Sequence, residues 1–229
     1  MKIAICIRGI CYDKNYKRHL ESDGYIIDFK IAGESIKKNV IEELRKENDV
    51  DIFLLTYKSG DDKIDKEVVE FYQPISITYN NQYSMDEFRF NNNVYQTQSR
   101  FMLQGIDEVL KNEKLGDFKY DFIFIFRFDL YFRRKITDLK LDCNKVCIGT
   151  QRDDLLQIIP RSRLEDFRHI INWIYETGTS THELEDTMKR NKIDVYVTRN
   201  NNEKLKDAYY ITDKGEKQLK IDLEFMKDN

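Results

Sequence analysis

The chain has 229 residues, of which 34% are charged and 41% hydrophobic, and its formal net charge is -3. A surface that binds a polyanion needs an excess of basic residues, so this balance argues against nucleic acid as a partner. No stretch approaches the about 20 consecutive apolar residues of a membrane-spanning helix. The length suits one domain built on one hydrophobic core.

The first half of the chain alternates between strand-like and helical patterns. Apolar runs predict strands at 2–7, 25–31, 51–57, 74–78 and 121–126. Helical spacing of apolar residues predicts helices over 34–46 and 94–110, and Gly116 helps to end the second of them. This alternation is typical of an α/β fold in which helices flank a mostly parallel central sheet.

The second half is less regular. After residue 132 the pattern predicts short strands at 145–148 and 155–159, followed by one helix from Arg161 and another from near Thr181. A strand at 193–198 and a terminal helix from Asp213 complete the prediction. Ser180 or Thr181 is the expected N-cap of the second helix. We expect a single domain over 1–229, in which the halves 1–135 and 136–229 are continuous.

The run at 120–132, Tyr-Asp-Phe-Ile-Phe-Ile-Phe-Arg-Phe-Asp-Leu-Tyr-Phe, begins as a strand that is apolar on both faces. If the chain stays extended, alternate side chains remain buried, namely Phe126, Phe128, Leu130 and Phe132. Arg127 and Asp129 then point together to the other face, roughly 7 Å apart along the strand. Open α/β sheets bind their ligands at the carboxyl ends of such strands. The alternative is that the two charges only pair with each other.

Four segments carry a resemblance to a known family: Lys-Ile-Ala-Ile-Cys-Ile-Arg-Gly at 2–9, Val-Asp-Ile-Phe-Leu-Leu-Thr-Tyr at 50–57, Tyr-Gln-Thr-Gln-Ser-Arg at 95–100, and the run at 119–132. Together they resemble GT-A-type glycosyltransferases, in particular small ones encoded by large DNA viruses or found in surface-polysaccharide clusters. The resemblance implies a GT-A-like, Rossmann-like sheet. It also implies a nucleotide-sugar donor, UDP-sugars included, bound by 1–135, and a glycan or other hydroxyl acceptor bound by 136–229.

Most members of that family carry an Asp-x-Asp motif whose last carboxylate binds a divalent cation at the diphosphate. The matching position here is Arg127-Phe128-Asp129. The resemblance therefore gives Asp129 the role of ligand to Mn²⁺ or Mg²⁺, which prefer oxygen ligands. Arg127 departs from the pattern, and its guanidinium fork would add to the stabilisation of the diphosphate.

Further donor-binding candidates come from the other matching segments. Arg8 and Gly9 follow the first strand, where a cation and backbone amides could meet a phosphate; a turn glycine beside a surface arginine explains them equally well. Tyr57 could stack on a base or simply pack. Gln96 and Arg100 share a helix face and could reach the diphosphate, although a solvated arginine needs no such role.

The acidic pair Asp153 and Asp154 is the first choice for the base that takes the proton of the acceptor hydroxyl, with a polar turn as the alternative. His182 is a rival that would complete a metal site, and Glu183 is a rival base. Glu183 and Glu185 also suit the first turn of a helix, where acidic side chains interact with the helix dipole.

Two other functions remain open from the sequence. A nucleotidyl- or phosphotransferase would use a similar sheet, but the chain lacks a glycine-rich phosphate loop. A non-catalytic nucleotide- or glycan-binding module would keep the fold without turnover. The four cysteines lack metal-site spacing and are expected to be reduced thiols in the cytoplasm, or in the host cytoplasm if the source is a virus.

Overall fold

The computed structural model describes residues 1–16, 25–80, 94–139, 142, 144–149, 155–197 and 209–211. Their main feature is a seven-stranded sheet with the order β10-β8-β9-β6-β1-β4-β5. The strands are β1 (Lys2–Gly9), β4 (Asp49–Tyr57), β5 (Ser76–Asn80), β6 (Phe122–Arg127), β8 (Val146–Ile148), β9 (Leu156–Pro160) and β10 (Val195–Val197). Only β9 runs antiparallel to its neighbours in this sheet. The predicted fold class, a mostly parallel sheet flanked by helices, is confirmed.

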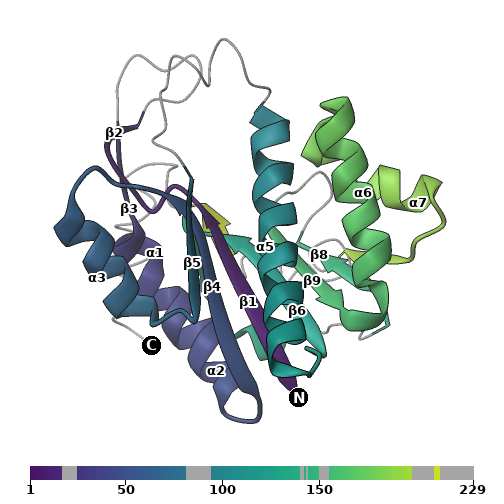
Figure 1. Ribbon diagram of the computed structural model, residues 1–229, viewed down its shortest axis with the longest axis horizontal. Coiled ribbons are helices and arrows are strands. Elements are labelled where there is room, and N and C mark those ends of the chain that lie inside the picture. Colours follow the sequence, from purple (N-terminus) through teal and green to yellow (C-terminus); the bar gives the residue numbers. More distant parts are fainter. Residues whose placement is uncertain are drawn as a thin grey trace.

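Helices cover both faces of the sheet (Figure 1). One face carries α1 (Phe29–Ile36), the π-helical turn η1 (Lys37–Ile41), α2 (Glu42–Arg45) and α3 (Asp62–Tyr72). The other face carries α5 (Val94–Gly116), α6 (Leu164–Thr177) and α7 (Leu184–Arg190). Short 3₁₀ turns are η2 (Ile136–Asp138), η3 (Arg161–Arg163) and η4 (Thr181–Glu183). No helix in the described part of the chain is long and apolar enough to cross a membrane.

Strand β6 lies at the centre of the sheet and is buried on both faces. Phe124 and Phe126 belong to the core under α1 and α3, whereas Ile123 and Ile125 belong to the core under α5 and α6. This is why its sequence is continuously apolar rather than alternating.

Two small antiparallel sheets lie outside the main sheet, β2 (Tyr12–Tyr16) with β3 (Tyr25–Asp28), and β7 (Leu130–Phe132) with β11 (Tyr209–Ile211). The predicted strand at 25–31 is therefore too long, and β3 pairs with β2 instead of joining the main sheet. The strand stops because the Asp28 carboxylate accepts the Lys30 N–H at 2.9 Å and begins α1.

Other boundaries differ from prediction for local reasons. The helix predicted at 34–46 corresponds to three consecutive segments, the end of α1 followed by η1 and α2. The helix predicted at 94–110 continues to Gly116. A Cβ at Gly116 would lie 2.2 Å from the Phe118 ring, so glycine permits this close approach. Helix α3 was not predicted, although Asp61 caps it. The helix expected from Asp213 lies outside the described residues.

Two of the described cysteines fit the expectation of free thiols. Cys6 and Cys11 are both buried and form no disulfide. Burial raises the pKa of the Cys6 and Cys11 thiols, so both remain protonated at neutral pH.

Candidate functional site

The carboxyl ends of β1 and β6 meet where the strand order reverses. After β1 the chain forms β4 and then β5 on one side of β1. It then passes through α5 and forms β6 on the other side of β1. The helices before β4 and β5 pack on one face of the sheet, whereas α5 packs on the opposite face. This is the switch point at which open α/β sheets form a crevice.

Two arginines lie side by side at this edge. Arg8 and Arg127 are direct partners in the parallel pairing of β1 with β6, on strands about 4.8 Å apart. Strand alternation places both side chains on the face covered by α5, with Cys6 and Ile125 before them. Arg8 is only 2% exposed. Parallel pairing thus gathers two cations from segments more than 100 residues apart in the sequence.

Arg127 and Asp129 form a two-pronged ion pair, which we call the carboxyl-end clasp. Arg127 Nε donates to Asp129 Oδ1 at 2.8 Å, and Nη2 donates to Oδ2. The predicted extended geometry, with the two side chains roughly 7 Å apart, is wrong, because β6 ends at Arg127 and a turn at Phe128–Asp129 precedes β7. The predicted burial of the alternate apolar residues is confirmed for Phe126, Phe128, Leu130 and Phe132.

The backbone under the clasp is fixed by long-range contacts. The Phe128 N–H donates to the Arg8 carbonyl at 3.1 Å. The buried Phe128 ring meets the Tyr72 ring edge to face, with centroids 5.7 Å apart. Further on, the Phe132 N–H donates to Ser35 Oγ at 3.0 Å. The turn is therefore held from both sides, whereas the clasped side chains retain partial exposure, 24% for Arg127 and 10% for Asp129.

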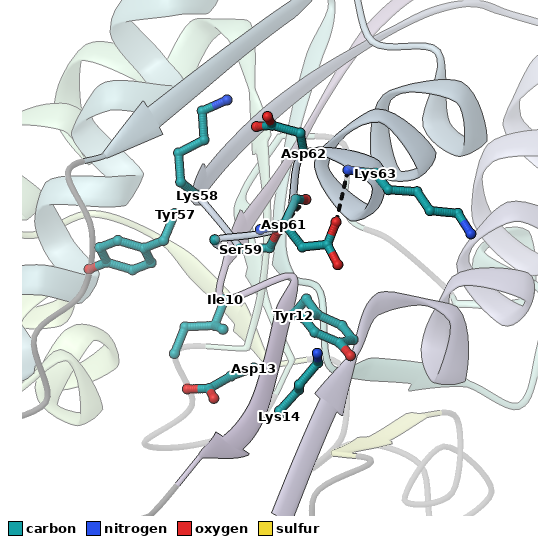
Figure 2. Close-up of a pocket in the computed structure, with 11 residues that line it drawn as sticks. Ile10, Tyr12, Asp13, Lys14, Tyr57, Lys58, Ser59, Asp61, Asp62 and Lys63 are labelled. Carbon is teal, nitrogen blue, oxygen red and sulfur yellow. Dashed lines mark hydrogen bonds between the residues drawn. The ribbon is translucent and has the colours of Figure 1, made fainter.

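A pocket of about 670 Å³ lies beyond the carboxyl ends of β1 and β4. It is lined by two tyrosines, three lysines, three aspartates and three other residues, namely Tyr12, Tyr57, Lys14, Lys58, Lys63, Asp13, Asp61, Asp62, Ile10, Ser59 and Gly60. Figure 2 shows Tyr57 and Tyr12 on different sides, with Ile10 between them in this view. Of these residues only Tyr57 was predicted.

The loop after β4 that forms one wall of this pocket is well braced. Asp61 accepts the Lys63 N–H at 3.0 Å and so caps α3, as Figure 2 shows. Lys58 Nζ lies 3.3 Å from the Asp65 carboxylate and 4.0 Å from the centre of the Tyr79 ring. Gly60 takes the left-handed φ of 79° that this turn requires. The wall is therefore largely preformed, as small-molecule sites usually are.

Tyr57 has contacts on two sides. Its ring meets the Phe101 ring of α5 edge to face at 5.2 Å, and it also lines the pocket. The two interpretations from the sequence, packing and ligand contact, are compatible in this geometry.

The structure separates the two helix residues that were predicted to act together. Arg100 Nη2 donates to Asn80 Oδ1 at 2.7 Å and so faces the end of β5. Gln96 Nε2 donates to the Tyr175 carbonyl of α6 at 3.2 Å. Their predicted role at a diphosphate stays a prediction.

Metal ligation was predicted for Asp129 and His182. His182 lies in η4, where its N–H donates to Ser180 Oγ at 3.2 Å, so Ser180 is the N-cap, one of the two predicted alternatives. Among the described residues, no three His, Cys, Asp or Glu side chains gather into a metal-binding group. One carboxylate suffices for Mg²⁺-type sites in which phosphate and water supply the other oxygens. The Asp129 oxygens already bind one cationic group, the Arg127 guanidinium. Asp129 thus fits such an ion only together with a phosphorylated ligand.

The predicted base residues Asp153 and Asp154 lie outside the described residues. Their assignment stays a prediction. Gly9 is described, and its φ of 109° is one that glycine adopts readily, which supports a turn requirement at the end of β1.

The sequence matches no known protein-family profile and no curated protein sequence. Among solved structures it is similar to a glycosyltransferase involved in glycosylation of the major capsid of PBCV-1, at 10% identity over 95% of this chain and 96% of that one, with a TM-score of 0.48. A protein described as a nucleotide-diphospho-sugar transferase from Desulfovibrio desulfuricans G20 has 12% identity, coverage of 86% and 78%, and a TM-score of 0.41. An active-site mutant of LgtC has 13% identity, coverage of 82% and 70%, and a TM-score of 0.40. At this level of similarity these likenesses assign no activity, and the function has to be inferred from the site itself.

Proposed function

We propose that the chain transfers a sugar from a nucleotide-diphosphate donor to a hydroxyl group of a glycan or similar acceptor. The observation that carries this proposal is the pairing of Arg8 with Arg127 at the carboxyl ends of β1 and β6, with Asp129 in the adjoining turn. Two guanidinium groups and one carboxylate leave this group with a net positive charge. A site of this kind favours a polyanionic ligand.

The two arginines suit the chemistry of the leaving group. When the bond between the anomeric carbon and the diphosphate oxygen breaks, negative charge gathers on the nucleoside diphosphate. Guanidinium forks bind phosphate oxygens through paired hydrogen bonds and stabilise that charge where it develops. The bond from the Phe128 N–H to the Arg8 carbonyl anchors the backbone that carries Arg127, so this backbone needs little reorganisation during the reaction.

The pocket beyond β1 and β4 supplies a place for the nucleoside. Its volume of about 670 Å³ lies within the range of small-molecule sites. The Tyr57 and Tyr12 rings offer apolar surface to a base, and the Asp62 carboxylate can accept hydrogen bonds from ribose hydroxyls. The chain passes from Arg8 to Ile10 directly into the pocket wall, so diphosphate and nucleoside subsites would be contiguous.

Asp129 is the residue that would hold Mn²⁺ or Mg²⁺ at the diphosphate, where such an ion supplies Lewis-acid stabilisation of the leaving group. Asp153 or Asp154 would take the proton of the acceptor hydroxyl as its oxygen bonds to the anomeric carbon. Both assignments belong to the proposal and rest on the positions of these residues in the sequence.

The direct test offers the purified chain a panel of nucleotide sugars with Mn²⁺ and measures thermal stability and the released nucleotide. A bound donor stabilises the folded state by about 2.7 kcal/mol at a hundred times its dissociation constant. We expect one donor class to stabilise the chain and to yield nucleoside diphosphate when an acceptor is present. Release of nucleoside monophosphate with pyrophosphate would instead identify a nucleotidyltransferase. Binding with neither hydrolysis nor transfer to any acceptor would identify a non-catalytic module.

A matched pair of variants locates the donor site. Arg8→Gln should abolish the stabilisation by the donor, whereas Arg161→Gln should retain it, because Arg161 pairs with Glu113 away from the proposed site. Equal donor affinity in both variants would refute the assignment of the arginine pair.

A further inference from the structure

We propose that the carboxyl-end clasp between Arg127 and Asp129 couples cation binding to donor binding, so that Asp129 takes a divalent cation only when a diphosphate draws Arg127 away. This inference rests on the proposed function for the identity of the ligand. It concerns regulation of the same site.

The hydrogen bonds of the clasp carry the first step. Arg127 Nε and Nη2 engage both oxygens of Asp129, one at 2.8 Å, so the fork faces the carboxylate along its full width. A divalent cation that approaches the same oxygens meets a fixed positive charge. Asp129 is therefore a weak cation ligand while the clasp is closed.

In the proposed exchange, Arg127 and Asp129 give up their contact with each other, and each gains a contact with a ligand of opposite charge. A diphosphate offers Arg127 two oxygens for a bidentate contact, as Asp129 does in the clasp, although the phosphate is tetrahedral and the carboxylate planar. Once Arg127 turns to the diphosphate, the Asp129 carboxylate is released to the cation that the diphosphate also binds. The exchange replaces the pair between Arg127 and Asp129 with two contacts to ligands of opposite charge, Arg127 to the diphosphate and Asp129 to the cation.

The fold permits this exchange by side-chain rotation alone. Phe128, between the two partners, is buried and bonded through its N–H to the Arg8 carbonyl at 3.1 Å. The Arg127 side chain is 24% exposed and that of Asp129 is 10% exposed, so the guanidinium is the more accessible of the two to an incoming ligand. The fixed turn keeps Asp129 beside the place that Arg127 vacates.

The test measures Mn²⁺ binding by calorimetry and by the spin-resonance signal of free Mn²⁺, with and without saturating nucleoside diphosphate. For the unmodified chain we expect nucleoside diphosphate to strengthen Mn²⁺ binding at least about tenfold, within the usual range of coupling between sites. Arg127→Gln should strengthen the binding of Mn²⁺ alone by a similar factor and reduce the coupling. Asp129→Asn should bind no Mn²⁺ at this site in either condition.

Two further variants keep the test decisive. Arg127→Lys retains the charge without the fork and should lie between the unmodified chain and Arg127→Gln. Arg161→Gln removes the two hydrogen bonds from Arg161 to Glu113 at the opposite end of β6 and should leave Mn²⁺ binding unchanged. If Mn²⁺ alone binds equally well with and without Arg127, or is lost in Arg127→Gln, the proposal is wrong. Coupling without turnover of any nucleotide sugar would uphold it while refuting the proposed function.

Discussion

The two ends of β6 carry the same kind of ion pair in different surroundings. At the carboxyl end, Arg127 clasps Asp129 within one turn. At the amino end, Arg161 Nε and Nη2 donate to the two oxygens of Glu113 at 3.0 and 3.1 Å. Both arginines are 24% exposed, so exposure alone does not distinguish the two pairs.

The two pairs differ in which parts of the chain they connect. Glu113 is 6% exposed and also accepts the Tyr120 N–H at 2.9 Å, which ties helix α5 to the start of β6. The Tyr120 hydroxyl in turn donates to Asp51 at 2.6 Å, and Lys2 Nζ lies 3.1 Å from the same carboxylate. The pair at the amino end thus ties α5 and the segment after β9 to the start of β6, whereas the pair at the carboxyl end joins two residues of one turn, beside Arg8 of β1. A similar pair stabilises the fold at one end and, in our proposal, exchanges partners at the other.

The largest effect is expected from Asp129→Asn at the carboxyl end. Loss of the carboxylate removes the proposed cation ligand, and sugar transfer should fall by roughly 10²–10³-fold, the usual effect of losing one group that stabilises transition-state charge. The melting temperature should change little, because the partly exposed Arg127 can turn to water. Initial rates at saturating donor, with melting curves alongside, check both. Full activity in this variant would show that Asp129 does not belong to the active site.

The frame around this site and the candidate residues Arg8, Arg127 and Asp129 follow from local sequence, whereas the detailed geometry of the site and the pocket do not. The apolar run of β6 predicts a strand buried on both faces, as found. The pairing of Arg127 with Asp129 was predicted only as the alternative, because alternation assumes a straight strand, whereas the chain turns at Phe128–Asp129 before β7. The pocket was missed because it joins Tyr12 to Lys58, residues brought together only by the parallel pairing of β1 with β4. Long-range pairing has no local signature.

A smaller effect, on stability alone, is expected from Glu113→Gln at the amino end. The change removes the negative charge that three donors share, and hydrogen bonds to charged groups contribute about 1.5–3 kcal/mol. The free energy of unfolding should fall by about 2 kcal/mol, which lowers the melting temperature by roughly 4–8 °C in a chain of this size.

Donor affinity is the control for that variant. Because Glu113 lies at the end of β6 opposite to the clasp, the dissociation constant for nucleoside diphosphate should not change. A weakened donor affinity with unchanged stability would contradict the division of roles between the two ends of β6.

The smallest effect is expected from Tyr57→Leu, which tests whether the pocket belongs to the carboxyl-end site. Leucine keeps apolar contact with Phe101 but removes the ring that lines the pocket, and an aromatic pair contributes about 0.5–1.5 kcal/mol beyond buried area. The dissociation constant for nucleoside diphosphate should therefore rise by a few-fold, as measured by calorimetry. Tyr57→Phe, which keeps the ring, should bind as the unmodified chain does. Tyr120→Phe removes a tyrosine hydroxyl at the other end and should also leave affinity unchanged. If Tyr57→Leu binds nucleoside diphosphate as tightly as these two variants, the nucleoside lies outside the pocket and only the arginine pair remains as its anchor.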